Sequence, residues 1–285
     1  MSARPELARM NLPGGESMKT ALRNVCGYAL WNAAYLLTAL GLAVMIKYHY
    51  SRAGSEDLRW ILLPTARVVE LFSGIRFVEE LHAGFINRSH RILIAPSCAG
   101  VNFLIIAFGV AVISGLHHIK KIALQFVWLV AALIAAYLLT IFVNAFRITI
   151  SIYSYDDRLF ALWLEPGRLH LLEGVLIYSF FLCLFYRIIE AGLCRAYGRI
   201  APAISEEKQN ALPAMTAVLP LFCYLTVTLL IPLLNGAAGG DVQRFAEHGA
   251  IVLTVSFVVA LLFWRQLGWS WLRDRLKRRP IANEK

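Results

Sequence analysis

Residues 94–103 read Ile-Ala-Pro-Ser-Cys-Ala-Gly-Val-Asn-Phe, and a long apolar run follows them to about Leu116. A proline and a serine interrupt the chain directly before Cys98, and Gly100 lets a second backbone come close. The pattern predicts that Cys98 lies where a loop turns into a membrane-spanning helix. The N-terminus of a helix carries partial positive charge and unpaired N–H groups, so it favours a thiolate and offers donors to an oxyanion.

The composition of the 285-residue chain points to a membrane protein. Hydrophobic residues make up 59% of it and charged residues only 16%, whereas soluble domains have about 25% charged residues. The net charge of +10 does not indicate a nucleic-acid partner, because the basic residues concentrate in the terminal segments and in loops between apolar runs. The lipid bilayer is the expected partner.

Six apolar runs have roughly the ~20 residues that a bilayer requires. They predict an all-α, polytopic helical bundle with about six transmembrane helices, at 28–46, 93–116, 122–143, 170–186, 213–234 and 249–267. The charged residues of 58–78 rule out a crossing there. The apolar residues of the same segment instead predict an amphipathic interfacial helix, interrupted near Pro64.

The runs divide the chain into five parts. These are a cytosolic N-terminal tail (1–24), a membrane core with the candidate catalytic residues (25–190), a cytosolic linker (191–212), two C-terminal transmembrane helices (213–268) and a basic cytosolic tail (269–285).

The distribution of Lys and Arg sets the expected orientation. Six spans put both termini on one side, and 17 of the 28 basic residues lie on that side. Because Lys and Arg accumulate in cytosolic loops, both termini are expected in the cytosol of a cytoplasmic (inner) membrane. Seven of the remaining 11 lie in 47–92 and count against this orientation. With both termini in the cytosol, Cys98, Arg147 and His170 are expected at the outer face, each at the end of a span.

Cys98 is expected to be a free thiol at that face, since the other cysteines fall on the inner side or within a span. A lone cysteine near a helix start is more often a small buried hydrophobe. The preceding Pro-Ser, the following Gly100 and the oxidising compartment favour a reactive role. The other four cysteines are Cys26, Cys183, Cys194 and Cys223.

Polar residues accompany the three candidates at helical spacing. Arg147 either anchors its helix at the lipid headgroups or belongs to a site, and Asn144, one turn earlier, favours a polar pocket. His170 is either a cap or a site residue, and Glu173 either orients its imidazole or is a surface charge. Rival residues on the same side are His82, His90, His248, Arg88, Arg91, Arg158 and Arg168.

Asn102 lies one turn after Cys98. It is expected either to hold a substrate carbonyl or to bond a neighbouring helix. An HExxH motif is absent from the sequence, and His82 and His90 are poorly spaced for a metalloprotease, so no metal or cofactor is expected.

Three pieces in this order resemble the exosortase/archaeosortase family of membrane transpeptidases. They are Pro96-Ser-Cys-Ala-Gly100 with Asn102, then Asn144-Ala-Phe-Arg147, then His170 with Gly174. The extended stretch 94–103 looks most like the exosortase K branch. The resemblance covers about 30–190, and the last two spans carry no family motif.

This resemblance implies a cysteine peptidase or transpeptidase. Its substrates would be exported proteins with a C-terminal sorting signal, made of a short motif, one transmembrane helix and a basic tail. By the same likeness, Cys98 is the nucleophile, Arg147 the stabiliser and His170 the acid/base. The new C-terminus would pass through a thioester to an unknown acceptor nucleophile.

Two other classes of function remain open from the sequence. A transporter or channel component would place charges near mid-membrane and carry broken helices in matching halves. A non-catalytic component of an export or polysaccharide system would tolerate the loss of all three polar residues.

Overall fold

The computed structural model describes residues 15–119, 121–156, 166–198, 219–234 and 242–277, with α1 side chains described from Asn32 onward. In chain order, its elements are α1 (Gly15–Arg52), α2 (Arg59–Ser73), β1 (Val78–Glu80), β2 (Gly84–Asn87), β3 (Ile92–Ile94), a 3-10 turn (Pro96–Cys98), α3 (Val101–His118), α4 (Ile122–Asp156), α6 (Pro166–Gly198), a π-helical turn (Thr226–Leu230), α8 (Ile231–Leu234) and α10 (Val242–Lys277).

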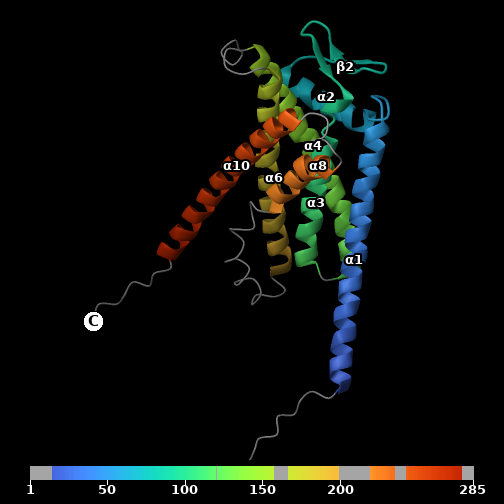
Figure 1. The fold of residues 1–285 in the computed structure, drawn as a ribbon, viewed down its shortest axis with the longest axis vertical. Helices are drawn as coiled ribbons and strands as arrows, with labels where there is room; N and C mark the ends of the chain where they lie inside the picture. The colour runs from blue at the N-terminus through green and yellow to red at the C-terminus, as the bar shows by residue number, and fades with distance from the viewer. Residues whose placement is uncertain (1–14, 120, 157–165, 199–218, 235–241, 278–285) are drawn as a thin grey trace, which may run out of the picture.

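Helix α3 is the centre of a bundle that α1, α4 and α6 complete (Figure 1). In its most apolar window, 67% of the residues are buried, compared with 17% in α10. The fully buried Tyr35 of α1 donates a hydrogen bond to the Val112 carbonyl of α3. Gly115 leaves room for the Trp128 indole of α4, whose Nε1 donates to the Ala111 carbonyl at 2.9 Å.

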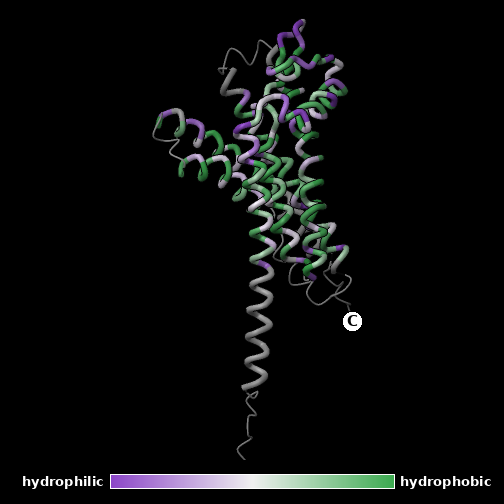
Figure 2. The backbone as a smooth tube through the Cα atoms, turned by 90° about the vertical axis from the view of Figure 1, so that its right-hand side faces the viewer, coloured by the Kyte–Doolittle hydropathy of each residue, from purple (hydrophilic) through white to green (hydrophobic). Residues whose placement is uncertain are grey.

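Four helices among the described residues are long and apolar enough to cross a membrane. They cover Pro96–Leu116, Ile122–Ser154, His170–Ala196 and Phe245–Phe263, and so overlap with the second, third, fourth and sixth predicted spans. Figure 2 shows that hydrophobic residues dominate the middle of the bundle. A shorter apolar helix, Leu219–Leu234, lies in the fifth predicted span, whose first residues are outside the described part of the chain.

The third predicted span ends too early. Helix α4 continues nine residues beyond Arg147 to Asp156, so Asn144 and Arg147 lie inside the helix and not at its end. Apolar residues continue the helical pattern there, and Ile148 and Thr149 are buried. The second predicted span begins too early, because Ile92–Ile94 is a strand. Helix α6 continues to Gly198, beyond residue 190, where the membrane core is predicted to end.

The all-α prediction missed a three-stranded antiparallel sheet in the order β1-β2-β3. The buried residues Phe85 and Ile94 are paired across β2 and β3 and pack in one cluster with α2. Gly84 has a φ of 120°, and a Cβ there would collide with the Ile94 carbonyl. Strands of three or four residues are too short to show an alternating pattern in the sequence.

Helix α2 has the predicted amphipathic character, but Pro64 does not interrupt it. Proline lacks the N–H that would bond the carbonyl of Trp60, four residues earlier. The Tyr137 hydroxyl of α4 donates to that carbonyl at 2.6 Å, and its ring stacks on the Trp60 indole. A tertiary contact therefore satisfies the carbonyl that the proline leaves without its helical donor.

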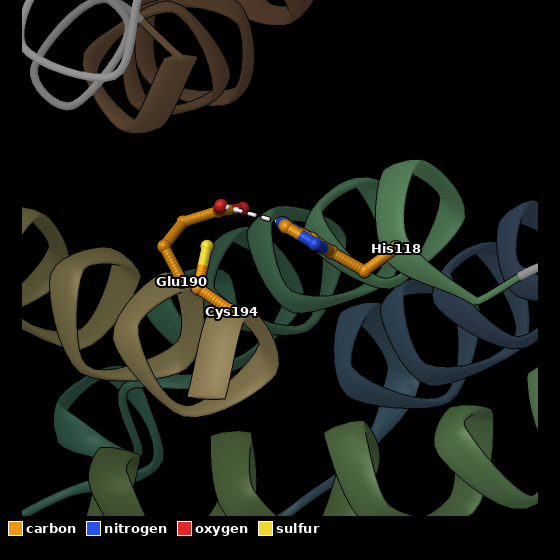
Figure 3. A group of neighbouring side chains, drawn as sticks. All are labelled: His118, Glu190 and Cys194. Atoms are coloured by element: carbon orange, nitrogen blue, oxygen red, sulfur yellow. Dashed lines mark hydrogen bonds and ion pairs between the residues drawn. The ribbon is translucent and has the colours of Figure 1, made fainter. Parts of the chain in front are cut away.

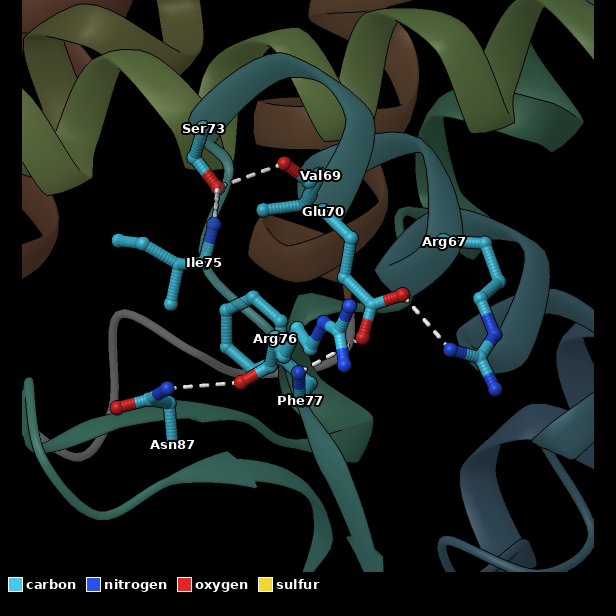
Figure 4. A network of polar contacts seen from close by, with 8 residues as sticks. All are labelled: Arg67, Val69, Glu70, Ser73, Ile75, Arg76, Phe77 and Asn87. Atoms are coloured by element: carbon cyan, nitrogen blue, oxygen red, sulfur yellow. Dashed lines mark hydrogen bonds and ion pairs between the residues drawn. The ribbon is translucent and has the colours of Figure 1, made fainter.

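Glu70 connects the end of α2 to the start of the sheet (Figure 4). Its carboxylate accepts hydrogen bonds from the Phe77 N–H and from Arg67, both at 2.7 Å. Burial alone would raise the pKa of Glu70, but the Phe77 hydrogen bond and the charges of Arg67 and Arg76 outweigh it, so the pKa lies below its usual value. The sheet fixed by this joint leads through β3 into Cys98.

Candidate functional site

Cys98 ends the 3-10 turn that follows β3. Its N–H donates to the Ala95 carbonyl, and the Ala99 N–H donates to the Pro96 carbonyl. These two N–H groups are therefore used within the turn, and Cys98 does not stand at the helix N-terminus itself. The side chain is half-buried.

The unpaired N–H groups predicted near Cys98 belong to the first turn of α3. Gly100 precedes the helix with a φ of 73°, and its carbonyl accepts the first helical bond, from the Leu104 N–H. The N–H groups of residues 101–103 therefore have no acceptor within the helix.

Asn144 joins three elements below this turn. It is fully buried, and its Nδ2 donates to the Cys98 carbonyl while its Oδ1 accepts from the Tyr178 hydroxyl at 2.9 Å. A Cβ on Gly100 would lie 3.1 Å from Asn144 Cγ, so the glycine permits this close approach. Asn144 thus connects the Cys98 turn to α4 and α6.

Arg147 lies along the face of α6 formed by His170, Gly174 and Tyr178. Its guanidinium is 5.4 Å from the centre of the Tyr178 ring, and a Cβ on Gly174 would lie 3.7 Å from its Nη1. The buried Nε of Arg147 has no hydrogen-bond partner among the described residues.

The imidazole of His170 lies between Arg147 and a serine. Arg147 Nη1 is 3.5 Å from His170 Nε2, at the long end of the hydrogen-bond range, and Ser151 Oγ is 3.1 Å from Nδ1. Arginine can only donate, so Nε2 is the acceptor and Nδ1 carries the proton in this arrangement. Ser151 in turn donates to Glu173 at 2.7 Å, so Glu173 orients the imidazole through Ser151.

Asn102 is exposed at the start of α3, and its Oδ1 accepts a hydrogen bond from Lys47 of α1 at 2.7 Å. This is the interhelical bond that the sequence left as one alternative. The Lys47 bond uses only the Oδ1 of Asn102, and the two N–H groups of the amide lie on the same exposed side chain.

Three of the rival residues near the sheet have local partners. His82 contacts Glu56, Arg88 contacts Glu80, and His90 contacts Asn87. Arg158 and the Arg168 side chain lie outside the described part of the chain.

Arg147 and His170 thus contact each other, and Asn144 and Tyr178 connect them to Cys98. Sequence reasoning missed Ser151 and Tyr178. Ser151 lies four residues after Arg147 and Tyr178 eight residues after His170, so helical spacing was the signal that could have found them. Compared with protein-family models, curated proteins and solved structures, the chain matches none of them.

Proposed function

We propose that the chain is a membrane-embedded cysteine peptidase or transpeptidase of the exosortase/archaeosortase type, which cleaves C-terminal sorting signals of exported proteins. One observation carries this proposal: Arg147 and His170 are in contact beside Asn144, which binds the Cys98 carbonyl. Cys98, Arg147 and His170 lie far apart in the sequence and on separate elements. A packing role for each would not require them to gather at one end of the bundle.

The contacts suit an acyl transfer. Arg147 first releases His170 Nε2, which then takes the proton of the Cys98 thiol, and the thiolate attacks the scissile carbonyl. The imidazolium then protonates the leaving amine as the thioester forms. The acceptor nucleophile returns a proton to His170 as it attacks the thioester and restores the thiol. Glu173, acting through Ser151, stabilises the imidazolium between these steps.

Arg147 is suited to hold the tetrahedral oxyanion. Its guanidinium cannot lose its proton in a protein, and its terminal Nη1 lies 3.5 Å from His170 Nε2, beside the proposed acid/base. The first N–H groups of α3 offer further donors near Cys98. A single donor of this kind typically stabilises a transition state by ~2.7–4 kcal/mol.

The dimensions of α4 support a site at the membrane surface. Its apolar stretch of 33 residues would be ~50 Å long, whereas the hydrocarbon core is only ~30 Å thick. About 20 Å must therefore stand outside the core or be taken up by tilt. The charged sheet and α2 lie at the Cys98 end (Figure 1), so this end is the one proposed to project.

The full topology belongs to the same proposal. It has about six spans in the inner membrane, α2 at the interface, both termini in the cytosol and the Cys98 site at the outer face. Water and the acceptor would then reach the site from outside.

Co-expression with an exported protein that carries a sorting signal tests the proposal. The full chain is expected to shorten the substrate at its C-terminus. Cys98→Ala should abolish the shift while the enzyme is still expressed, and Cys223→Ser, which alters another half-buried thiol, should preserve it. Normal processing by Cys98→Ala would reject the assignment.

Arg147→Lys provides a second test at the same site. Lysine keeps the charge but not the planar guanidinium, so processing should fail. Near-normal turnover would indicate that Arg147 only anchors its helix at the lipid headgroups.

A further inference from the structure

A second group of reactive side chains lies at the end of the bundle opposite Cys98. His118 is the last residue of α3, and Glu190 and Cys194 lie four residues apart on α6. His118 Nε2 is 2.8 Å from Glu190 Oε2, and the nitrogen, oxygen and sulfur atoms all lie within 4.8 Å of one another. Figure 3 shows the His118 ring and the Cys194 sulfur both directed toward the Glu190 carboxylate.

Packing alone does not account for this group. The side chains of His118 and Glu190 are each only 9% exposed, and burying such a pair carries a desolvation penalty that often cancels its attraction. Apolar side chains would fill the same space without that penalty. The Cys98 chemistry does not use these residues either, because they lie at the other end of α3.

We propose that His118, Glu190 and Cys194 bind one divalent transition-metal ion of the zinc class. Imidazole nitrogen, carboxylate oxygen and thiolate sulfur are the ligands that zinc prefers, whereas magnesium and calcium require oxygen ligands. Cys194 releases its proton to solvent when the metal binds. Three protein ligands leave a fourth position of the tetrahedron for water.

The distances are close to those of a loaded site. Tetrahedral zinc with bonds of ~2.0–2.3 Å separates its ligand atoms by ~3.3–3.8 Å. The His118 nitrogen and the Glu190 oxygen must therefore separate by about 0.5 Å, and the thiolate must move by up to about 1.2 Å. Rotation of the side chains suffices for such shifts. The metal would clamp the end of α3 to α6, and this role does not depend on the proposed peptidase activity.

Cobalt(II) binding to the purified full chain in detergent tests the proposal, because cobalt replaces zinc and reports thiolate ligation by its absorption. One cobalt per chain and a thiolate-to-cobalt band are expected, with zinc displacing the cobalt. Cys194→Ser should lose the band, and His118→Gln and Glu190→Gln should each weaken binding by at least ~10-fold. Cys223→Ser and His90→Gln are matched controls that should bind as the original chain does.

Absence of bound cobalt, or a thiolate band that persists in Cys194→Ser, would overturn the proposal. Alkylation of the unsubstituted chain avoids any folding defect of the variants. Zinc should slow maleimide labelling of Cys194 and leave that of Cys223 unchanged. Equal labelling of Cys194 with and without zinc also counts against the site.

Discussion

Replacing Asn144 by leucine tests the joint that holds the Cys98 turn in place. Leucine has a similar size but no polar atoms, so the variant leaves the Cys98 carbonyl and the Tyr178 hydroxyl without their partner. A buried polar group that loses its hydrogen-bond partner lowers the free energy of unfolding by about 1–3 kcal/mol. Asn144 is fully buried, but Cys98 and Tyr178 are only half-buried, so the low end of that range applies to each.

The expected loss is therefore ~2 kcal/mol in the free energy of unfolding. At ~2 °C per kcal/mol for a chain of this size, the midpoint of thermal unfolding in detergent should fall by ~4 °C. The freed turn should also expose the Cys98 thiol, so maleimide should label it faster than in the unsubstituted chain.

Thr140→Val is the matched control, because Thr140 lies one turn earlier on α4, is equally buried and bonds only its own helix. A double-mutant cycle with Tyr178→Phe isolates the shared bond. The two losses should not add, since Asn144→Leu already orphans the Tyr178 hydroxyl. Strict additivity, or a midpoint for Asn144→Leu equal to that of Thr140→Val, would refute the reasoning.

Three further predictions concern the scaffold. Gly115→Ala should destabilise the chain by about 1–3 kcal/mol, because a Cβ would lie 2.2 Å from the Trp128 indole. Gly109→Ala is the control, because a Cβ there meets open space, and thermal unfolding should show it to be neutral or slightly stabilising. The lowered pKa of Glu70 stabilises the fold at pH values above its ordinary pKa, and this contribution is lost as the pH falls through the folded-state pKa. Unfolding midpoints measured across acidic pH should therefore fall less steeply in Glu70→Gln, and parallel curves would contradict the assignment. Tyr137→Phe removes the donor that replaces the missing proline N–H in α2, and a loss of ~1 kcal/mol in the free energy of unfolding is expected, which an unchanged chemical-denaturation midpoint would disprove.

Much of the candidate site was predictable because its residues follow helical spacing. Asn144, Arg147 and Ser151 are three and four residues apart on α4, and His170 and Glu173 are three apart on α6. Such intervals place side chains on one face whatever the rest of the fold does. Their local grouping is thus a property of the helix, although Ser151 was overlooked.

Other features required the packed molecule. The Tyr137 hydroxyl satisfies the Trp60 carbonyl across 77 residues of sequence, and this contact keeps α2 continuous through its proline. The strands of the sheet are too short for a periodic signal, so only their pairing reveals them.

The sequence by itself determined that this chain forms long apolar helices, and it singled out the polar residues that interrupt them, because hydrophobic length and helical period are local properties. Only the tertiary structure decided which of those residues meet. His118 reaches Glu190 across 72 residues, and Asn144 reaches Cys98 across 46. Such meetings depend on the rotation and relative height of neighbouring helices, which side-chain packing sets and no local pattern encodes.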